Sequence, residues 1–105
     1  MNDQASAALE RALELSRAVL AAADRGEGKM VLSIDAERLQ LLKSARSSAK
    51  SFDASQRVLM REIAALNAKS IGALEYQRQL KGREIEQAAV GRRAVKAYAN
   101  ARYLR

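Results

Sequence analysis

Apolar residues recur every three or four positions near the start of the chain, which predicts an amphipathic α-helix. The small and apolar positions of this stripe are Ala5, Ala8, Leu9, Ala12, Leu13, Ser16, Val19, Leu20 and Ala23. Asn2 or Asp3 can cap the start of this helix. Gly26 can take the left-handed conformation that is favoured just after a helix end. We therefore expect a first helix over about residues 3–25.

A second stripe predicts a helix over about residues 29–49. Arg38 interrupts the main stripe at an inward position, and the apolar members are Val31, Ile34, Leu41, Leu42, Ala45 and Ala49. Leu32, Ala36 and Leu39 form a weaker stripe on another face. A helix that is apolar on two sides indicates contact on two sides. We therefore expect an additional partner or a third helix.

Residues from about 54 to 100 contain nothing that must end a helix. Asp53 and Gln56 have the spacing of a capping box at its start. Three glycines, at Gly72, Gly82 and Gly91, each cost about 1 kcal/mol relative to alanine inside a helix, but none ends it as a proline would. Such a helix spans roughly 70 Å, against roughly 30–35 Å for each shorter one. It either breaks near one of these glycines or extends well beyond the other two helices.

The composition indicates an all-α fold, because strong helix formers dominate and proline is absent. We expect one helical domain over residues 1–105, a helical hairpin of two shorter helices packed on a long C-terminal helix as a three- to four-helix bundle. No run of about 18 apolar residues is present to span a membrane. The N-terminus lacks the basic segment of a secretory signal. We expect a soluble, cytoplasmic protein.

The sequence offers few groups for catalysis. It contains no histidine and no cysteine, which removes the usual general base, the thiolate nucleophile and the commonest metal ligands. Asp35 and Glu37 are two residues apart and do not face one another on a helix. We expect no enzymatic activity and no cofactor, and we predict no catalytic, cofactor-binding or metal-ligating residue.

The long helix carries the candidate surface for a partner. Its inward stripe, which should pack on the two shorter helices, consists of Leu59, Ile63, Leu66, Ser70, Ala73 and Leu74. Met60, Ala64 and Ile71 share a neighbouring face that suits a partner, a second copy or a wider core. Beyond Gly72 no single heptad register of the kind a coiled coil requires fits the apolar residues Tyr76, Leu80, Ile85, Val90 and Val95. That segment is a solvated helix, or it docks on a partner or on a second copy.

The formal net charge of +7 is concentrated in the second part of the chain. Residues 61–105 carry a balance of +6, against +1 for residues 1–60. A sign asymmetry of this kind often marks an interaction segment.

The basic end of the chain carries Arg92, Arg93 and Lys96. These cations are consistent with phosphate contact, so a small helical nucleic-acid-binding or regulatory protein is the alternative function. However, Tyr98 and Tyr103 fall on different sides of a helix and make no common stacking surface. A membrane-binding face needs bulky apolar residues, and Ala94, Ala97 and Ala101 are too small for one. An acidic protein partner, or the chain's own acidic half, suits this basic tail better.

Several segments share their order and spacing with one known family. They are Leu15–Ala23 (LSRAVLAAA), Gly28, Asp35–Arg38 (DAER) with Leu41 and Leu42, Glu62–Asn67 (EIAALN), Ile71 with Leu74, and Gly91–Tyr98 (GRRAVKAY). Together they resemble the bacterial flagellar export chaperones of the FliT type, over most of the chain from about Leu9 to Tyr98.

This resemblance implies a small cytoplasmic chaperone that holds the C-terminal part of the filament-cap protein FliD before export. It also implies transfer of that cargo to the export gate and ATPase, and in some bacteria regulation of flagellar gene expression. Carried onto this chain, the partner-binding groove involves Ile63, Leu66, Ile71 and Leu74. The segment that covers the groove until cargo displaces it begins at about Gly91 and includes Arg92, Arg93, Lys96 and Tyr98.

Overall fold

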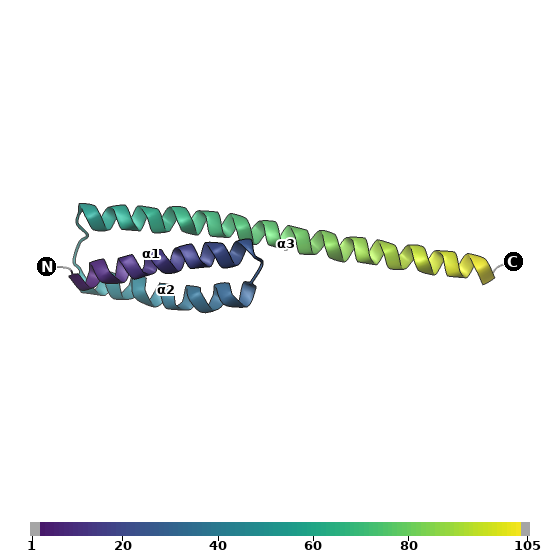
Figure 1. Cartoon of the computed structure of the whole chain (residues 1–105), viewed down its shortest axis with the longest axis horizontal. Coiled ribbons are helices and arrows are strands. Elements are labelled where there is room, and N and C mark those ends of the chain that lie inside the picture. The colour runs from purple at the N-terminus through teal and green to yellow at the C-terminus, as the bar shows by residue number, and fades with distance from the viewer. Residues whose placement is uncertain (1–2, 104–105) are drawn as a thin grey trace. The chain divides into compact units, whose positions relative to one another are not determined.

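A computed structural model describes the backbone of residues 3–103 and the side chains of residues 4–96. Within this range the chain forms three α-helices and no strand: α1 (Asp3–Asp24), α2 (Gly28–Ser48) and α3 (Ala54–Tyr103) (Figure 1). The prediction of an all-α fold is therefore confirmed. The chain divides into two compact units, Met1–Leu74 and Glu75–Arg105.

The end of α1 has the geometry predicted for it. Gly26 has a φ of 71°. Its N–H donates to the carbonyl of Ala23 at 3.0 Å, and the N–H of Glu27 donates to that of Ala22 at 2.9 Å. These two bonds form a Schellman motif, which satisfies the last carbonyls of the helix. The chain can then turn within a few residues and begin α2 at Gly28.

The side chain of Glu27 stabilises the same turn without capping α2. Its carboxylate accepts a hydrogen bond from Arg25 Nε at 2.8 Å, in an exposed ion pair. This bond lowers the pKa of Glu27. No side-chain hydrogen bond from Glu27 caps the start of α2. The position of α2 therefore depends on the Schellman turn and on packing.

Gly26→Ala is expected to destabilise the protein by about 1–2 kcal/mol, because a side chain in the left-handed region meets the following carbonyl. Gly28→Ala is the matched control, since Gly28 has no positive φ and nothing lies within 4 Å of an added Cβ. Urea unfolding followed by circular dichroism measures both variants. Equal midpoints for the two would contradict the role of Gly26.

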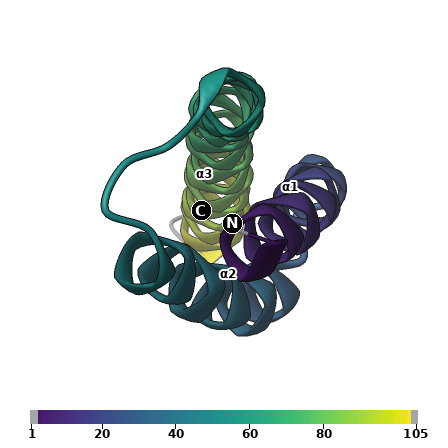
Figure 2. The same cartoon turned by 90° about the vertical axis from the view of Figure 1, so that its left-hand side faces the viewer.

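The start of α3 is a capping box, as its sequence predicts. The N–H of Gln56 donates to Asp53 Oδ1 at 2.8 Å, and the N–H of Asp53 donates to Gln56 Oε1 at 2.9 Å. Gln56 is only 1% exposed, and its Nε2 donates to the hydroxyl of Ser6 at 3.0 Å. Figure 2 shows the extended connection that leads from α2 into this cap. The side chain of Gln56 thus completes the cap of α3 and also joins α3 to α1.

The core of the first unit contains residues from all three helices. In its main cluster, Ala5, Ala8, Leu9, Ala12 and Leu13 of α1 meet Ala45 of α2 and Ile63 of α3. A second cluster contains Val19, Ala22, Ala23 and Val31, and Ile34 and Ala73 pack against it. The predicted stripe of α1 is therefore buried almost throughout, and Leu15 is buried as well.

The long helix is unbroken at the three glycines where an interruption was the alternative. α3 is a single helix of 50 residues from Ala54 to Tyr103. A Cβ added at Gly72, Gly82 or Gly91 would meet nothing within 4 Å. These glycines therefore serve no close packing among the described residues. The backbone tolerates them because each weakens a helix by only about 1 kcal/mol.

Candidate partner-binding surfaces

Two of the four residues predicted to bind a partner belong to the core. Ile63 is 4% exposed and lies in the main cluster with residues of α1 and α2. Leu66 is partly buried and packs against the same cluster. The apolar side chain of Ile63 is thus covered by the protein's own helices. Both residues also belong to the inward stripe that the sequence predicts to pack on the shorter helices, and they lie as that stripe predicts.

The other two residues remain accessible. Ile71 is 50% exposed and Leu74 is 37% exposed. They are three residues apart on α3 and so lie on the same side of the helix. Between them, Ala73 packs against the second cluster, and Ser70, just before them, is 3% exposed. Ile71 and Leu74 thus border the core without being enclosed by it, and we call them the Ile71–Leu74 surface.

The weaker stripe predicted on α2 is also exposed. Leu32 is 72% exposed and Leu39 is 47% exposed, and Ala36 between them is exposed as well. Met30, at 49%, lies near the start of the same helix. The sequence predicted contact on two sides of α2, and among the described residues no apolar cluster includes these side chains. Scattered exposed apolar residues are common on protein surfaces, so they do not define a site by themselves.

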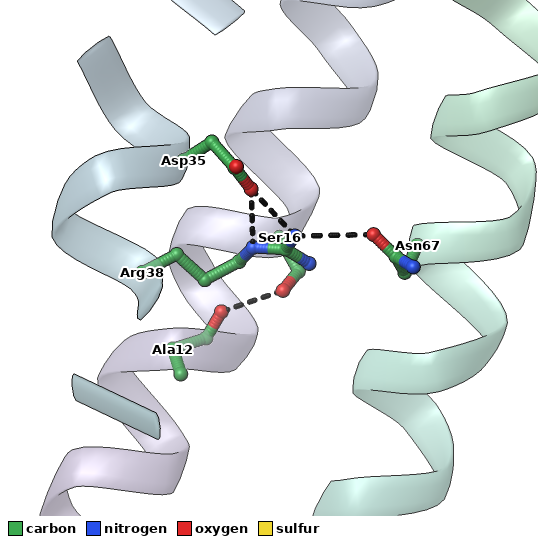
Figure 3. A network of polar contacts seen from close by, with 5 residues as sticks. All are labelled: Ala12, Ser16, Asp35, Arg38 and Asn67. Carbon is green, nitrogen blue, oxygen red and sulfur yellow. Dashed lines mark hydrogen bonds and ion pairs between the residues drawn. The ribbon is translucent and has the colours of Figure 1, made fainter. Parts of the chain in front are cut away.

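A buried polar network links α2 to α3 (Figure 3). Arg38 is 7% exposed. Its Nε donates to Asp35 Oδ1 at 3.0 Å, and its Nη2 donates both to that oxygen and to Asn67 Oδ1, the latter at 3.1 Å. A buried guanidinium needs such partners, because burying an unpaired charge is costly. The inward position of Arg38 is visible in the sequence, but its partner Asn67 is not.

This network gives a structural role to residues of two segments that the sequence analysis singled out. Asp35 and Arg38 come from the DAER segment, and Asn67 ends the EIAALN segment. They bond to one another, and Arg38 is buried whereas Asp35 and Asn67 are partly exposed. These residues therefore contribute to the link between α2 and α3.

The basic tail lies in the second unit. Arg92, Arg93 and Lys96 are all exposed, and none of them forms an ion pair with a described residue. The side chain of Tyr98 lies outside the described residues. An exposed cation without a counterion keeps its charge available to a partner, over a distance that salt limits to about 10 Å. The candidate residues of the tail are thus accessible as charges.

Metal-binding clusters and membrane spans are both absent among the described residues. No group of three or more acidic side chains is placed to hold a metal ion in that part of the chain. None of its helices combines the length and apolar character needed to cross a membrane. A scan against protein-family models, a search of curated proteins and a search of solved structures each found no match for this chain.

Proposed function

We propose that this protein is a cytoplasmic flagellar export chaperone of the FliT type, which binds the C-terminal part of the filament-cap protein FliD. Ile71 and Leu74 support this proposal most directly, because they stay 50% and 37% exposed beside a completed core. Exposed apolar side chains next to buried ones often mark a binding site. The order and spacing of the resembling segments point to the kind of cargo.

The proposed architecture is a hairpin of α1 and α2 packed against the first part of α3, as a three-helix bundle. The main core cluster supports it, because α1, α2 and α3 all contribute to it. In this arrangement the bundle holds α3 in place through the Gln56–Ser6 and Arg38–Asn67 hydrogen bonds. The Ile71–Leu74 surface then stands on a fixed helix, which favours specific binding over loose hydrophobic capture.

The proposed mechanism is binding without chemistry. An apolar segment of the cargo covers Ile71 and Leu74, as an amphipathic helix does when it lies in a groove. Cargo held in this way cannot assemble prematurely, and transfer to the export gate or ATPase releases it. Regulation of flagellar gene expression would use the same protein-binding capacity. Ile63 and Leu66 support cargo binding indirectly, because they pack α3 on the core.

Ile71→Asp and Leu74→Asp are each expected to abolish capture of cargo while leaving helicity largely intact. Burying a carboxylate against an apolar cargo side chain is strongly unfavourable, whereas on the free protein it points to water. Co-expression with the C-terminal segment of the filament-cap protein, followed by affinity purification, measures capture. Circular dichroism checks that the helices are unchanged.

Val58→Asp is the matched control, because Val58 is 47% exposed on the same helix but faces away from Ile71. It should leave capture unchanged. Full binding by both Ile71→Asp and Leu74→Asp would remove these residues from the cargo site. A salt titration tests the alternative of nucleic-acid binding, since phosphate binding weakens linearly in log salt whereas an apolar surface is nearly indifferent.

A further inference from the structure

The part of α3 within the second unit carries a regular seam once cations are counted with apolar residues. Starting at Arg78, positions spaced alternately by three and four residues form one side of the helix. They are Arg78, Lys81, Ile85, Ala88, Arg92 and Val95. This is three consecutive heptads, whereas the apolar residues of the segment alone fit no register. We call these six residues the basic heptad face.

All six side chains of the basic heptad face are exposed. Ile85 is 66% exposed and Val95 is 71% exposed, which is unusual for branched apolar residues in a regular seam. Among the described residues, no ion pair involves Arg78, Lys81 or Arg92. No carboxylate occupies any of the six positions. The face therefore offers three apolar contacts and three free cations to a helix laid along it.

The order of these residues disfavours pairing with a second copy. In a parallel pair in register, Arg78 faces Arg78 and Lys81 faces Lys81 of the other copy. In the antiparallel pair centred on Ile85 and Ala88, Lys81 faces Arg92 twice. Like charges facing one another in a coiled-coil seam are unfavourable, and a polar residue at a seam position selects the partner.

We propose that the basic heptad face binds an acidic amphipathic helix of a partner protein. The partner places apolar side chains opposite Ile85, Ala88 and Val95, and carboxylates opposite the three cations. Each apolar contact removes exposed surface from water, and each carboxylate pairs with a cation that lacks one. Lys96, next to the seam, adds a fourth cation for a carboxylate at the edge.

The same face suits other anionic surfaces less well. A bilayer requires a wide face of bulky apolar residues, whereas this seam is narrow and includes Ala88. A nucleic acid uses cations together with aromatic stacking, and no aromatic residue occupies the seam. Only a helix with alternating apolar and acidic positions uses both the spacing and the charge.

The inference is independent of the filament-cap assignment, because it concerns another segment and a chemically defined probe. The probe is a fluorescein-labelled synthetic helix with leucine opposite the apolar positions and glutamate opposite the cations. A peptide of the same composition, scrambled so that these residues share no face, is its control. Fluorescence anisotropy with the full-length chain should show binding at least about tenfold tighter for the patterned peptide. Equal binding of the two peptides would overturn the proposal.

Ile85→Asp is expected to weaken binding of the patterned peptide by about tenfold or more, since it places a carboxylate in the seam opposite leucine. Val90→Asp is the matched control, because Val90 is 61% exposed on the same segment but lies outside the seam. It should change the affinity by less than about twofold. Equal loss in both variants would show that the seam has no special role.

Charge reversal tests the electrostatic half of the proposal. The double variant Arg78→Glu with Lys81→Glu should lose the acidic peptide and gain a version that carries lysine at the facing positions. Arg83→Glu with Arg93→Glu changes the charge equally outside the seam and should retain the acidic peptide. The proposal is wrong if the full chain self-associates through Ile85 in sedimentation experiments. It is equally wrong if the chain binds anionic vesicles or duplex DNA instead of the peptide, and if that binding depends on Arg78 and Lys81.

Discussion

Leu9→Ala is expected to lower the free energy of unfolding of the first unit by about 3–5 kcal/mol. Leu9 is fully buried and among the largest fully buried side chains, and it lies in the main cluster with residues of all three helices. The substitution leaves a cavity that the surrounding alanines, already small, cannot fill. Since a domain of this size is stable by only about 5–15 kcal/mol, this loss is a large part of its total stability and should clearly lower the unfolding midpoint.

Leu32→Ala is the matched control for this prediction. Leu32 is 72% exposed, and alanine is the better helix former, so the change should stay within about 0.5 kcal/mol. Urea unfolding by circular dichroism gives both values. Hydrogen exchange of the amides in α1 assigns the loss to the first unit, because residues 75–96 are exposed for the most part and exchange through local opening. Similar losses in both variants would contradict the assignment of the core.

Local patterns predicted the helices because each depends on residues close together in sequence. The stripe of α1 follows from spacing alone, and Leu9 and Ala12 are both fully buried. Gly26 and the pair Asp53 and Gln56 determine helix ends through contacts within a few residues. Such short-range contacts can be predicted from a single sequence, so the start of α3 and the end of α1 were correctly predicted.

Contacts between residues far apart in the sequence could not be predicted in the same way. Helical spacing put Ile63 on the inward stripe of α3 and Ile71 on a neighbouring face, but it did not decide whether the protein's own helices or a partner covers either residue. In the structure one is 4% exposed and the other 50%. The hydrogen bond of Arg38 to Asn67 joins residues 29 positions apart. The basic heptad face has no apolar heptad pattern, because cations occupy three of its six positions.

Arg38→Ala is expected to destabilise the protein by about 2–4 kcal/mol. The side chain of Arg38 is 9% exposed and pairs with Asp35, which is 34% exposed. Its loss removes packed methylenes and leaves Asp35 and Asn67 without their donor. Because water can still reach Asp35, the cost should fall below that of breaking a fully enclosed ion pair. Arg46→Ala is the control on the same helix, since Arg46 is exposed and should change stability by less than about 0.5 kcal/mol.

A double-mutant cycle separates the charge from the packing. Arg38→Met keeps most of the side-chain volume and removes the charge, and Asp35→Leu removes the carboxylate. Each single variant should be destabilised because it leaves a partner behind. The double variant should recover at least about 1 kcal/mol of that loss, since well-packed apolar residues often replace an ion pair at little cost. Strictly additive losses in urea unfolding would show that Arg38 and Asp35 are not coupled. In that case the link between α2 and α3 would depend on the Arg38–Asn67 hydrogen bond and on the apolar core around Ile63.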